Sequence, residues 1–402
     1  MNALTTQSPA PRIALFSGNY NYLRDGANQA LNRWVEYLER HGVAVRVYSP
    51  TSEVPAFSPA GTLISVPSIA IPGRNEYRLA LGLPRSVQRD LEDFQPNIFH
   101  LSAPDLLGYS ALQLAKKWQL PAVASVHTRF ETYLKYYGLG WLENTMVRYL
   151  RHFYSSCVEI YAPTESTART LAAQRMSDSV RIWGRGVDSD RFSPAKRSDA
   201  WRAAHGFGVN DVVVTFVGRL VLEKGLDLFA QSVSRARQRG LAFKILIVGD
   251  GPERDRFRKR LPDAVFAGFL EGDDLARAYA SSDIFFNPST TEGIGNVTLE
   301  AMASGLAPIC ANATGSVSLV SHGVTGLVSN QCCPDDFVDH LFHLVARADV
   351  RRAMGQAART ASLTYVWDNV LRGLLSQIQG VLSKHNTYST AESSAPVASL
   401  QL

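Results

Sequence analysis

The chain has 402 residues, and its hydrophobic share of 46% and charged share of 19% are those of an ordinary globular protein with sizeable cores. This length predicts roughly two or three domains. The net charge of +5 is modest and lacks the clustered basic face that nucleic-acid binding needs, so we expect no nucleic-acid partner.

The first half opens with a strand, a loop, a helix and a second strand. Buried apolar runs predict strands at 12–17 and 43–48, and apolar residues at helical spacing predict a helix at 27–40. This order is the opening of an α/β unit. Gly26 lies in the loop at the end of the first strand, where such sheets bind ligands, although a plain strand-to-helix connection uses glycine as well.

A histidine follows a later strand of the same half. Strands are predicted at 97–101 and 122–126, with a helix at 106–118 between them. His127 comes directly after the second strand, and Arg129 follows two residues on. A histidine at this edge of a sheet can carry a proton or donate a hydrogen bond to a ligand. The alternative is a histidine that bonds a neighbouring carbonyl.

Residues 133–154 combine aromatic and basic side chains. Interfacial membrane segments have this composition, and so do ordinary helices packed against a sheet. Residues 1–195 carry 20 Lys and Arg against 16 Asp and Glu, which is compatible with an anionic membrane surface. We therefore expect a weak acceptor or membrane contact from Arg129, Tyr133, Tyr136, Tyr137 and Trp141.

The middle of the chain holds an acidic pair and a candidate linker. Asp188 and Asp190 have a spacing that some metal-dependent sugar transferases use, but no acidic neighbours add further oxygen ligands. We interpret the pair as loop residues and expect no metal site. The polar stretch 193–208 is a predicted linker between two domains.

The strand and helix pattern restarts after this stretch, with strands at 212–217 and 243–248 around a helix at 226–239. Arg219 and Lys224 bracket the first strand-to-helix loop. Two cations and a helix N-terminus would then face one place, which suits a diphosphate. The alternative is a pair of ordinary surface cations.

Gly249 and Gly251 follow the next strand and form half of a dinucleotide-binding fingerprint. The third glycine is absent, because residue 254 is Arg. A nicotinamide-dependent enzyme is therefore disfavoured. A further strand is predicted at 265–269.

The strand at 284–286 leads into a second glycine loop and a helix that starts near Asn296. Gly293 and Gly295 let the backbone approach a ligand, and the helix N-terminus suits a phosphate. Glu292 and Glu300 add carboxylates, which accept hydrogen bonds from hydroxyls such as those of ribose and a hexose. The alternative is a surface loop with two solvated glutamates.

Three motifs resemble the retaining glycosyltransferases of family 4, which have the GT-B fold. They are G-R-L-V-L-E-K-G at 218–225, G-D-G-P at 249–252 and E-G-I-G-N-V-T-L-E-A-M-A-S-G at 292–305. Residues 67–81 and 127–141 are similar to the branch that glycosylates diacylglycerol-type lipids, which includes sulfoquinovosyl- and mannosyl-transferases. Ile294 departs from the family, which often has Phe there.

The resemblance implies a role for each matching residue. Arg219 and Lys224 would hold the donor diphosphate and stabilise the leaving group, and His127 would lie against the donor sugar. Glu292 would face the sugar, and Glu300 would bind the ribose hydroxyls. The remaining donor-binding positions are Gly26, Gly251, Phe269, Leu270, Gly293, Ile294, Gly295, Asn296 and Val297.

The resemblance also implies the architecture: a GT-B fold with two Rossmann-like parallel-sheet domains facing a cleft. We expect an acceptor-side domain at 1–194, a nucleotide-sugar domain at 195–364, a terminal helix at 365–384 that crosses back to the first domain, and a disordered tail at 385–402.

The implied activity is transfer of a hexose from a UDP- or GDP-linked sugar to a hydroxyl, with retention of configuration and with no metal or other cofactor. The expected acceptor is a membrane glycerolipid or glycolipid. Alternatives are a soluble or polysaccharide acceptor, a nucleotide-sugar epimerase on the same fold, and a non-enzymatic binding module. No signal peptide and no run of about 18 apolar residues is evident, and the four cysteines match no zinc or disulfide spacing, so we expect a cytoplasmic protein with peripheral contact to the inner face of an anionic membrane.

Overall fold

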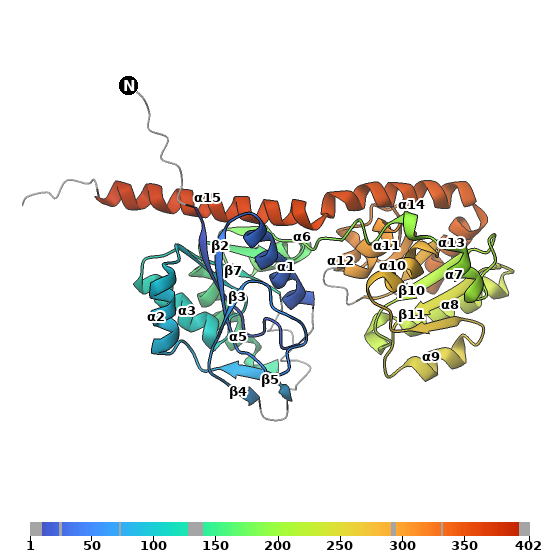
Figure 1. Ribbon diagram of the computed structural model, residues 1–402. Coiled ribbons are helices and arrows are strands. Elements are labelled where there is room, and N and C mark those ends of the chain that lie inside the picture. The colour runs from blue at the N-terminus through green and yellow to red at the C-terminus, as the bar shows by residue number, and fades with distance from the viewer. Residues whose placement is uncertain are drawn as a thin grey trace, which may run out of the picture. The chain divides into compact units, whose positions relative to one another are not determined.

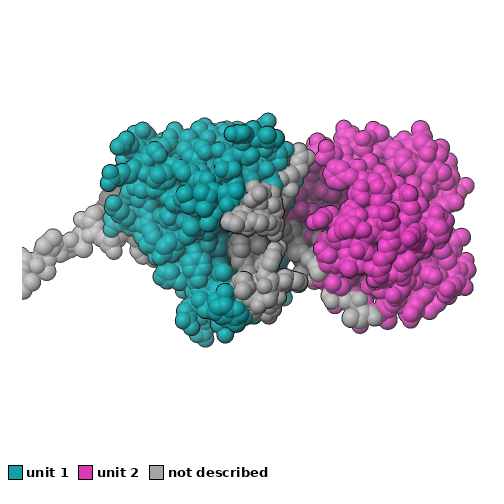
Figure 2. All heavy atoms as spheres, turned by 90° about the horizontal axis from the view of Figure 1, so that it is seen from below, with its two compact units in different colours: residues 1–183, 371–402 teal, residues 184–370 magenta. Residues whose placement is uncertain are grey.

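The computed structural model describes residues 10–23, 26–71, 74–127, 140–290, 295–330 and 333–393. The chain forms two compact units, coloured separately in Figure 2. Unit 1 comprises residues 1–183 and 371–402, and unit 2 comprises residues 184–370. Each unit is built on a parallel sheet with helices on both faces, which confirms the predicted Rossmann-like architecture (Figure 1).

Among the described residues of unit 1, seven parallel strands form one sheet. In sheet order they are β3 (Thr62–Ser65), β2 (Ala44–Ser49), β1 (Arg12–Phe16), β6 (Ile98–Leu101), β7 (Ala122–Ser125), β8 (Glu159–Ala162) and β9 (Val180–Ile182). The central strands are buried over their whole length, because helices cover both faces.

The helices of unit 1 lie in two layers (Figure 1). They are α1 (Gly26–Arg40), α2 (Arg85–Phe94), α3 (Leu106–Lys117), α5 (Glu143–Ser155) and α6 (Glu165–Ala173). Leu91, Leu107 and Phe153 bring α2, α3 and α5 into one core with Phe99 of β6. His100 is the next residue along β6, and its side chain therefore points to the opposite face.

A two-stranded antiparallel hairpin lies beside this sheet (Figure 1). Its strands are β4 (Ser68–Ile71) and β5 (Arg74–Ala80). Ala80 is buried in the core that α2 and α3 share. The sequence pattern did not predict these two strands or α2.

Among the described residues of unit 2, six parallel strands form the second sheet. In sheet order they are β12 (Val265–Gly268), β11 (Lys244–Val248), β10 (Val213–Val217), β13 (Ile284–Asn287), β14 (Ala307–Ala311) and β15 (Leu327–Ser329). The predicted strands of this half match these within a residue or two, because fully buried strands are continuous apolar runs.

Helices cover both faces of this second sheet as well. They are α7 (Asp199–Ala204), α8 (Leu226–Gln238), α9 (Arg254–Arg260), α10 (Gly272–Ala280), α11 (Asn296–Ala303), α12 (Thr314–Val317), α13 (Pro334–Ala346) and α14 (Ala348–Ser362). Phe229 and Phe257 place α8 and α9 in one core, whereas Tyr279 and Leu299 place α10 and α11 in the other.

The predicted linker at 193–208 is wrong, because this stretch is a packed part of unit 2. Arg202 of α7 is 1% exposed. Its guanidinium donates to the carbonyls of Ser281, Gly208 and Asp211 at 2.8, 2.7 and 2.7 Å and pairs with Asp283. This stretch is polar in composition, yet it forms the short helix α7, which the hydrogen bonds of the buried Arg202 fix to the rest of unit 2.

Unit 1 ends at Trp183, before the expected boundary at 194. The chain beyond it packs with unit 2: the Val187 N–H donates to the Tyr365 carbonyl at 2.8 Å, and Arg359 donates to the carbonyls of Ser189 and Phe192. These bonds explain why residues 184–192 belong to unit 2.

The last helix, α15 (Trp367–Ser393), begins in unit 2 and continues in unit 1, where Leu371, Leu374 and Ile378 are buried. It extends past 385, so the expected disordered tail is wrong for residues 385–393. Nowhere in the described part of the chain is a helix both long enough and apolar enough to cross a membrane.

Candidate active site

The loops that follow β10, β11, β12 and β13 leave the second sheet at one edge, because these strands are parallel. β10 has β11 on one side and β13 on the other, so the strand order reverses between β10 and β13. Open α/β sheets bind ligands at such a switch point. Arg219 and Lys224 lie on the loop after β10, and Gly295 lies on the connection after β13.

Gly225 brings these two loops into contact. It follows the single turn Leu222–Lys224 and precedes α8, with a φ of +73°. A Cβ atom at this position would lie 2.7 Å from the carbonyl oxygen of Pro288. Glycine satisfies both the left-handed backbone and the close approach. The loop that carries Arg219 and Lys224 is therefore held directly against the segment after β13.

Arg219 is exposed and Lys224 is half-buried. They lie at the two ends of a loop that leads into the N-terminus of a 13-residue helix, α8. The first N–H groups of a helix and its partial positive charge attract anions, and two cations beside them strengthen that attraction. This arrangement can hold a diphosphate.

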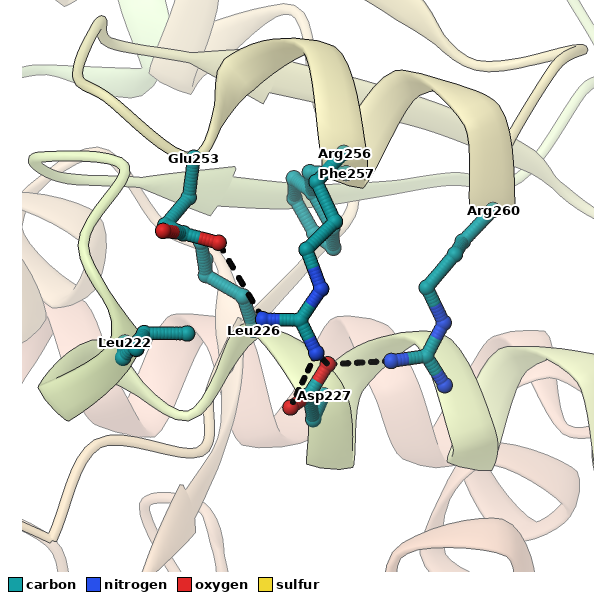
Figure 3. A pocket seen from close by; sticks show the side chains of 7 residues that line it. All are labelled: Leu222, Leu226, Asp227, Glu253, Arg256, Phe257 and Arg260. Carbon is teal, nitrogen blue, oxygen red and sulfur yellow. Dashed lines mark hydrogen bonds and ion pairs between the residues drawn. The ribbon is translucent and has the colours of Figure 1, made fainter.

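A small pocket beside the same loop contains two more arginines (Figure 3). Arg256 donates to both oxygens of Asp227 at 3.1 and 3.0 Å and to Glu253 at 3.2 Å, and Arg260 also bonds Asp227. Both cations are paired with carboxylates inside the pocket. These ion pairs therefore hold α8 against α9. The pocket lining also includes Leu222, which lies in the loop between Arg219 and Lys224; we call this loop the cation loop.

Gly249 and Gly251 let the loops after β10 and β11 pack closely. A Cβ on Gly249 would lie 2.0 Å from the Gly218 carbonyl oxygen, and one on Gly251 would lie 2.4 Å from that of Leu220. The Leu220 N–H donates to the Asp250 carbonyl at 2.9 Å. The two glycines thus have a packing reason that is independent of any dinucleotide.

The end of β12 carries the two residues expected near the nucleotide base. Phe269 is 70% exposed, whereas Leu270 packs against the core of unit 2. An exposed aromatic ring at this edge offers a surface on which a base can stack.

Gly295 starts α11 with a φ of +73°, and Asn296 and Val297 form its first turn. The predicted residues Glu292, Gly293 and Ile294 lie outside the described residues. Behind the loop, the Asn287 side chain donates to the Thr298 hydroxyl at 3.2 Å. This buried bond ties the end of β13 to α11.

Glu300 is half-buried on α11, and a residue that the sequence pattern did not reveal orients it. The Tyr279 hydroxyl lies 3.2 Å from Glu300 Oε2 and 3.2 Å from the carbonyl oxygen of Val297. A hydroxyl donor at this distance fixes the carboxylate side chain. Tyr279 is a buried aromatic at helical spacing on α10, which in a sequence looks like any core residue.

His127 follows β7 in unit 1, as predicted. Its ring meets the Trp183 ring edge-on, with centroids 5.3 Å apart. Trp183 also contacts the rings of His100 at 5.8 Å and Trp34 at 6.4 Å. His100 Nε2 bonds the Ser125 hydroxyl, and complete burial lowers the pKa of His100 to about 3. A neutral, buried aromatic cluster therefore supports His127.

A buried carboxylate lies near the loop after β1. Asp105 caps α3 by accepting from the Gly108 N–H at 2.8 Å, and burial raises the pKa of its carboxyl group. A Cβ on Gly18 would lie 2.2 Å from Asp105 Oδ2, so the loop passes directly over it. Gly26 begins α1 and is exposed.

The predicted acceptor residues Arg129, Tyr133, Tyr136 and Tyr137 lie outside the described residues, and Trp141 is 76% exposed. The aromatic residues of α5 face inward, since Phe153 and Tyr154 are buried. These two rings pack α5 against the core of unit 1, and the acceptor or membrane contact stays a prediction. Within the described ranges, no group of three or more His, Cys, Asp or Glu side chains could hold a metal ion.

Two Rossmann-like units, one with cations and a helix N-terminus at its switch point, have the architecture of the GT-B fold. Solved structures share this fold over nearly the whole chain. Sucrose-phosphate synthase from Thermosynechococcus elongatus superposes with a TM-score of 0.72 at 18% identity, covering 93% of this chain and all of that one. The Anabaena HepE structure with UDP and glucose gives a TM-score of 0.68 at 15% identity, over 92% and 100%.

The chain belongs to glycosyltransferase family 4. Residues 24–191 match the domain described as Glycosyltransferase Family 4, and residues 211–347 match Glycosyl transferases group 1. The chain is 32% identical to a GDP-mannose-dependent alpha-mannosyltransferase of Mycolicibacterium smegmatis, over 93% of this chain and 99% of that one. It is 32% identical to a sulfoquinovosyl transferase of Arabidopsis thaliana, over 89% and 71%. An alpha-monoglucosyldiacylglycerol synthase of Acholeplasma laidlawii is 21% identical over 93% and 98%.

Proposed function

We propose that this glycosyltransferase moves a hexose from a UDP- or GDP-linked donor to a hydroxyl of a membrane glycerolipid or glycolipid, with retention of configuration. One observation carries the donor half of the proposal: Arg219, Lys224 and the N-termini of α8 and α11 gather at the switch point of unit 2. The relatives support the acceptor half, since one is named for diacylglycerol and another for sulfoquinovosyl transfer.

The donor diphosphate lies on the loop of Arg219 and Lys224 and against the start of α11. Glu300, oriented by Tyr279, accepts hydrogen bonds from the ribose hydroxyls. Phe269 provides the surface for the base. These contacts use the diphosphate and ribose that UDP and GDP share.

In the transfer step the bond between the anomeric carbon and the diphosphate oxygen breaks, and a bond to the acceptor oxygen forms on the same face. The acceptor proton passes to the leaving phosphate oxygen. Arg219 and Lys224 neutralise the charge that grows on the leaving group, and fixed cations of this kind lower a barrier by several kcal/mol. His127, whose ring packs against Trp183, offers a ring nitrogen to a sugar hydroxyl. The enzyme works at the inner face of the cytoplasmic membrane without a metal ion.

The test is transfer of labelled glucose or mannose from UDP- and GDP-linked donors to vesicles that contain diacylglycerol, followed by organic extraction. Wild type is expected to label the lipid, and NMR is expected to show the donor's anomeric configuration in the product. Lys224→Ala is expected to lose turnover by about a hundredfold or more. Lys259→Ala, an exposed lysine of α9, is the matched control.

Undiminished turnover in Lys224→Ala overturns the donor site. Conversion of the donor into a different nucleotide-sugar, with no acceptor present, identifies an epimerase instead. Label in a water-soluble sugar but not in the lipid overturns the acceptor half alone.

A further inference from the structure

Asn287, the last residue of β13, has a buried side chain that is polar at both ends. It is 3% exposed, although an asparagine is usually found at the surface. A buried amide has to place both its oxygen and its nitrogen in hydrogen bonds. The partners of these two atoms show which parts of unit 2 this side chain holds together.

The oxygen of the Asn287 amide fixes one peptide group of the segment that follows β13. Oδ1 accepts from the Ser289 N–H at 3.1 Å. This N–H and the Pro288 carbonyl belong to the same planar, trans peptide group, so they point in opposite directions. Because Asn287 holds the N–H, it also sets the direction of the Pro288 carbonyl.

The Pro288 carbonyl is the group against which Gly225 packs. A Cβ on Gly225 would lie 2.7 Å from the carbonyl oxygen and 3.0 Å from the carbonyl carbon of Pro288. Gly225 follows Lys224 directly and precedes the first residue of α8. The peptide group that Asn287 holds is therefore in contact with the start of α8.

The nitrogen of the same amide holds a second helix. Nδ2 donates to the Thr298 hydroxyl at 3.2 Å, and Thr298 has no exposed surface. Thr298 lies in the first turn of α11, three residues after Gly295. Because this bond is buried, water cannot take the place of either partner when the bond is lost.

We propose that Asn287 is a positioning residue for the donor diphosphate, because it sets the N-termini of α8 and α11 relative to each other; this inference rests on the donor site proposed above. Its two amide atoms act on loops that leave neighbouring strands, β10 and β13. A diphosphate held by two helix N-termini needs both at a fixed separation, since hydrogen bonds weaken steeply with distance and angle. One buried side chain supplies this separation.

The experiment removes one of the two bonds in Thr298→Val, which keeps the shape of the side chain but not the hydroxyl. Nucleotide binding is measured by calorimetric titration of the full chain with UDP and with GDP. Thr298→Val is expected to raise the Kd of the nucleotide that wild type binds by about three- to tenfold, the effect of one lost hydrogen bond. Thr298→Ser keeps the hydroxyl and is expected to bind as wild type does.

Thr215→Val is the matched control. Thr215 has no exposed surface either, and its hydroxyl donates to the Leu246 carbonyl at 3.2 Å within the same sheet. This variant loses a buried hydroxyl and its bond but keeps Asn287 and both partners of its amide. It is expected to have a lower melting temperature and an unchanged Kd, which separates a loss of positioning from a loss of stability.

Hydrogen exchange of the nucleotide-free proteins tests the coupling of the two helices directly. The amides in the first two turns of α8 and of α11 are both expected to exchange faster in Thr298→Val than in wild type, because Asn287 is then free to turn away from Ser289. In Thr215→Val the two helix starts are expected to exchange as in wild type. Faster exchange in α11 alone would overturn the link to α8.

Equal Kd values in Thr298→Val and wild type overturn the inference and leave the donor site standing. The same rise of Kd in Thr215→Val and Thr298→Val does so as well, because the effect would then follow stability alone. Wild type that binds neither UDP nor GDP instead overturns the proposed donor site, and this inference falls with it.

Discussion

His100 links the stability of unit 1 to pH. It has no exposed surface, its Nε2 bonds the Ser125 hydroxyl, and burial lowers its pKa from 6.5 to about 3. Between these two values the unfolded chain binds a proton at this position and the folded chain does not. The free energy of unfolding therefore falls as the pH falls below 6.5.

The size of the effect follows from the two pKa values. Lowering the pH from 7 to 5 should cost about 2 kcal/mol of unfolding free energy through His100 alone, and this figure changes little as long as the folded pKa stays well below 5. In His100→Gln the amide can still donate to Ser125, but nothing titrates. We expect the variant to lack this share of the pH dependence.

The assay is urea unfolding at pH 7 and pH 5, followed by tryptophan fluorescence. For each protein we take the loss of unfolding free energy from pH 7 to pH 5. Subtracting the loss in His100→Gln from the loss in wild type cancels the contributions of other groups. His152→Gln, an exposed histidine of α5, is the control and is expected to behave as wild type. The same loss in wild type and His100→Gln would refute the argument, because it would mean that His100 accepts a proton in the folded state.

Two further predictions concern the candidate donor site. Both Gly225 and Gly240 have a positive φ, so replacing either with Ala should cost about 1–2 kcal/mol of unfolding free energy in urea. Gly225→Ala should cost clearly more than Gly240→Ala, because only at Gly225 would the new Cβ meet the Pro288 carbonyl. Equal losses would contradict the close approach. Tyr279→Phe should weaken nucleotide binding by about three- to tenfold in a calorimetric titration, because Glu300 loses the hydroxyl that orients it, and an unchanged Kd would show that Tyr279 only fills space.

The strands of unit 2 were predictable because each is a continuous apolar run between turn signals. The run at 212–217 ends at the cation loop, and the glycine that joins this loop to α8 is the residue the backbone requires. Local sequence therefore located the loops at the switch point.

Features that depend on distant partners were not predictable. The stretch 193–208 looks like a linker because the carbonyls that hold Arg202 come from residues as far along the chain as Ser281. The β4–β5 hairpin was missed because its short strands combine exposed apolar residues such as Ile69 with the buried Ala80, which gives no clear periodic pattern. The role of Tyr279 was missed because the carboxylate that its hydroxyl orients, that of Glu300, lies on another helix.

The central claim is that unit 2 binds a nucleoside diphosphate through Arg219 and Lys224. The most direct measurement is the melting temperature with UDP and with GDP, each without and with magnesium, for wild type and Lys224→Ala. A nucleotide at about 100 times its Kd stabilises the folded protein by about 2.7 kcal/mol, which is enough to detect. We predict that either UDP or GDP raises the melting temperature of wild type without metal. The same nucleotide is expected to leave the melting temperature of Lys224→Ala unchanged. No shift in wild type, or the same shift in both proteins, would contradict the claim.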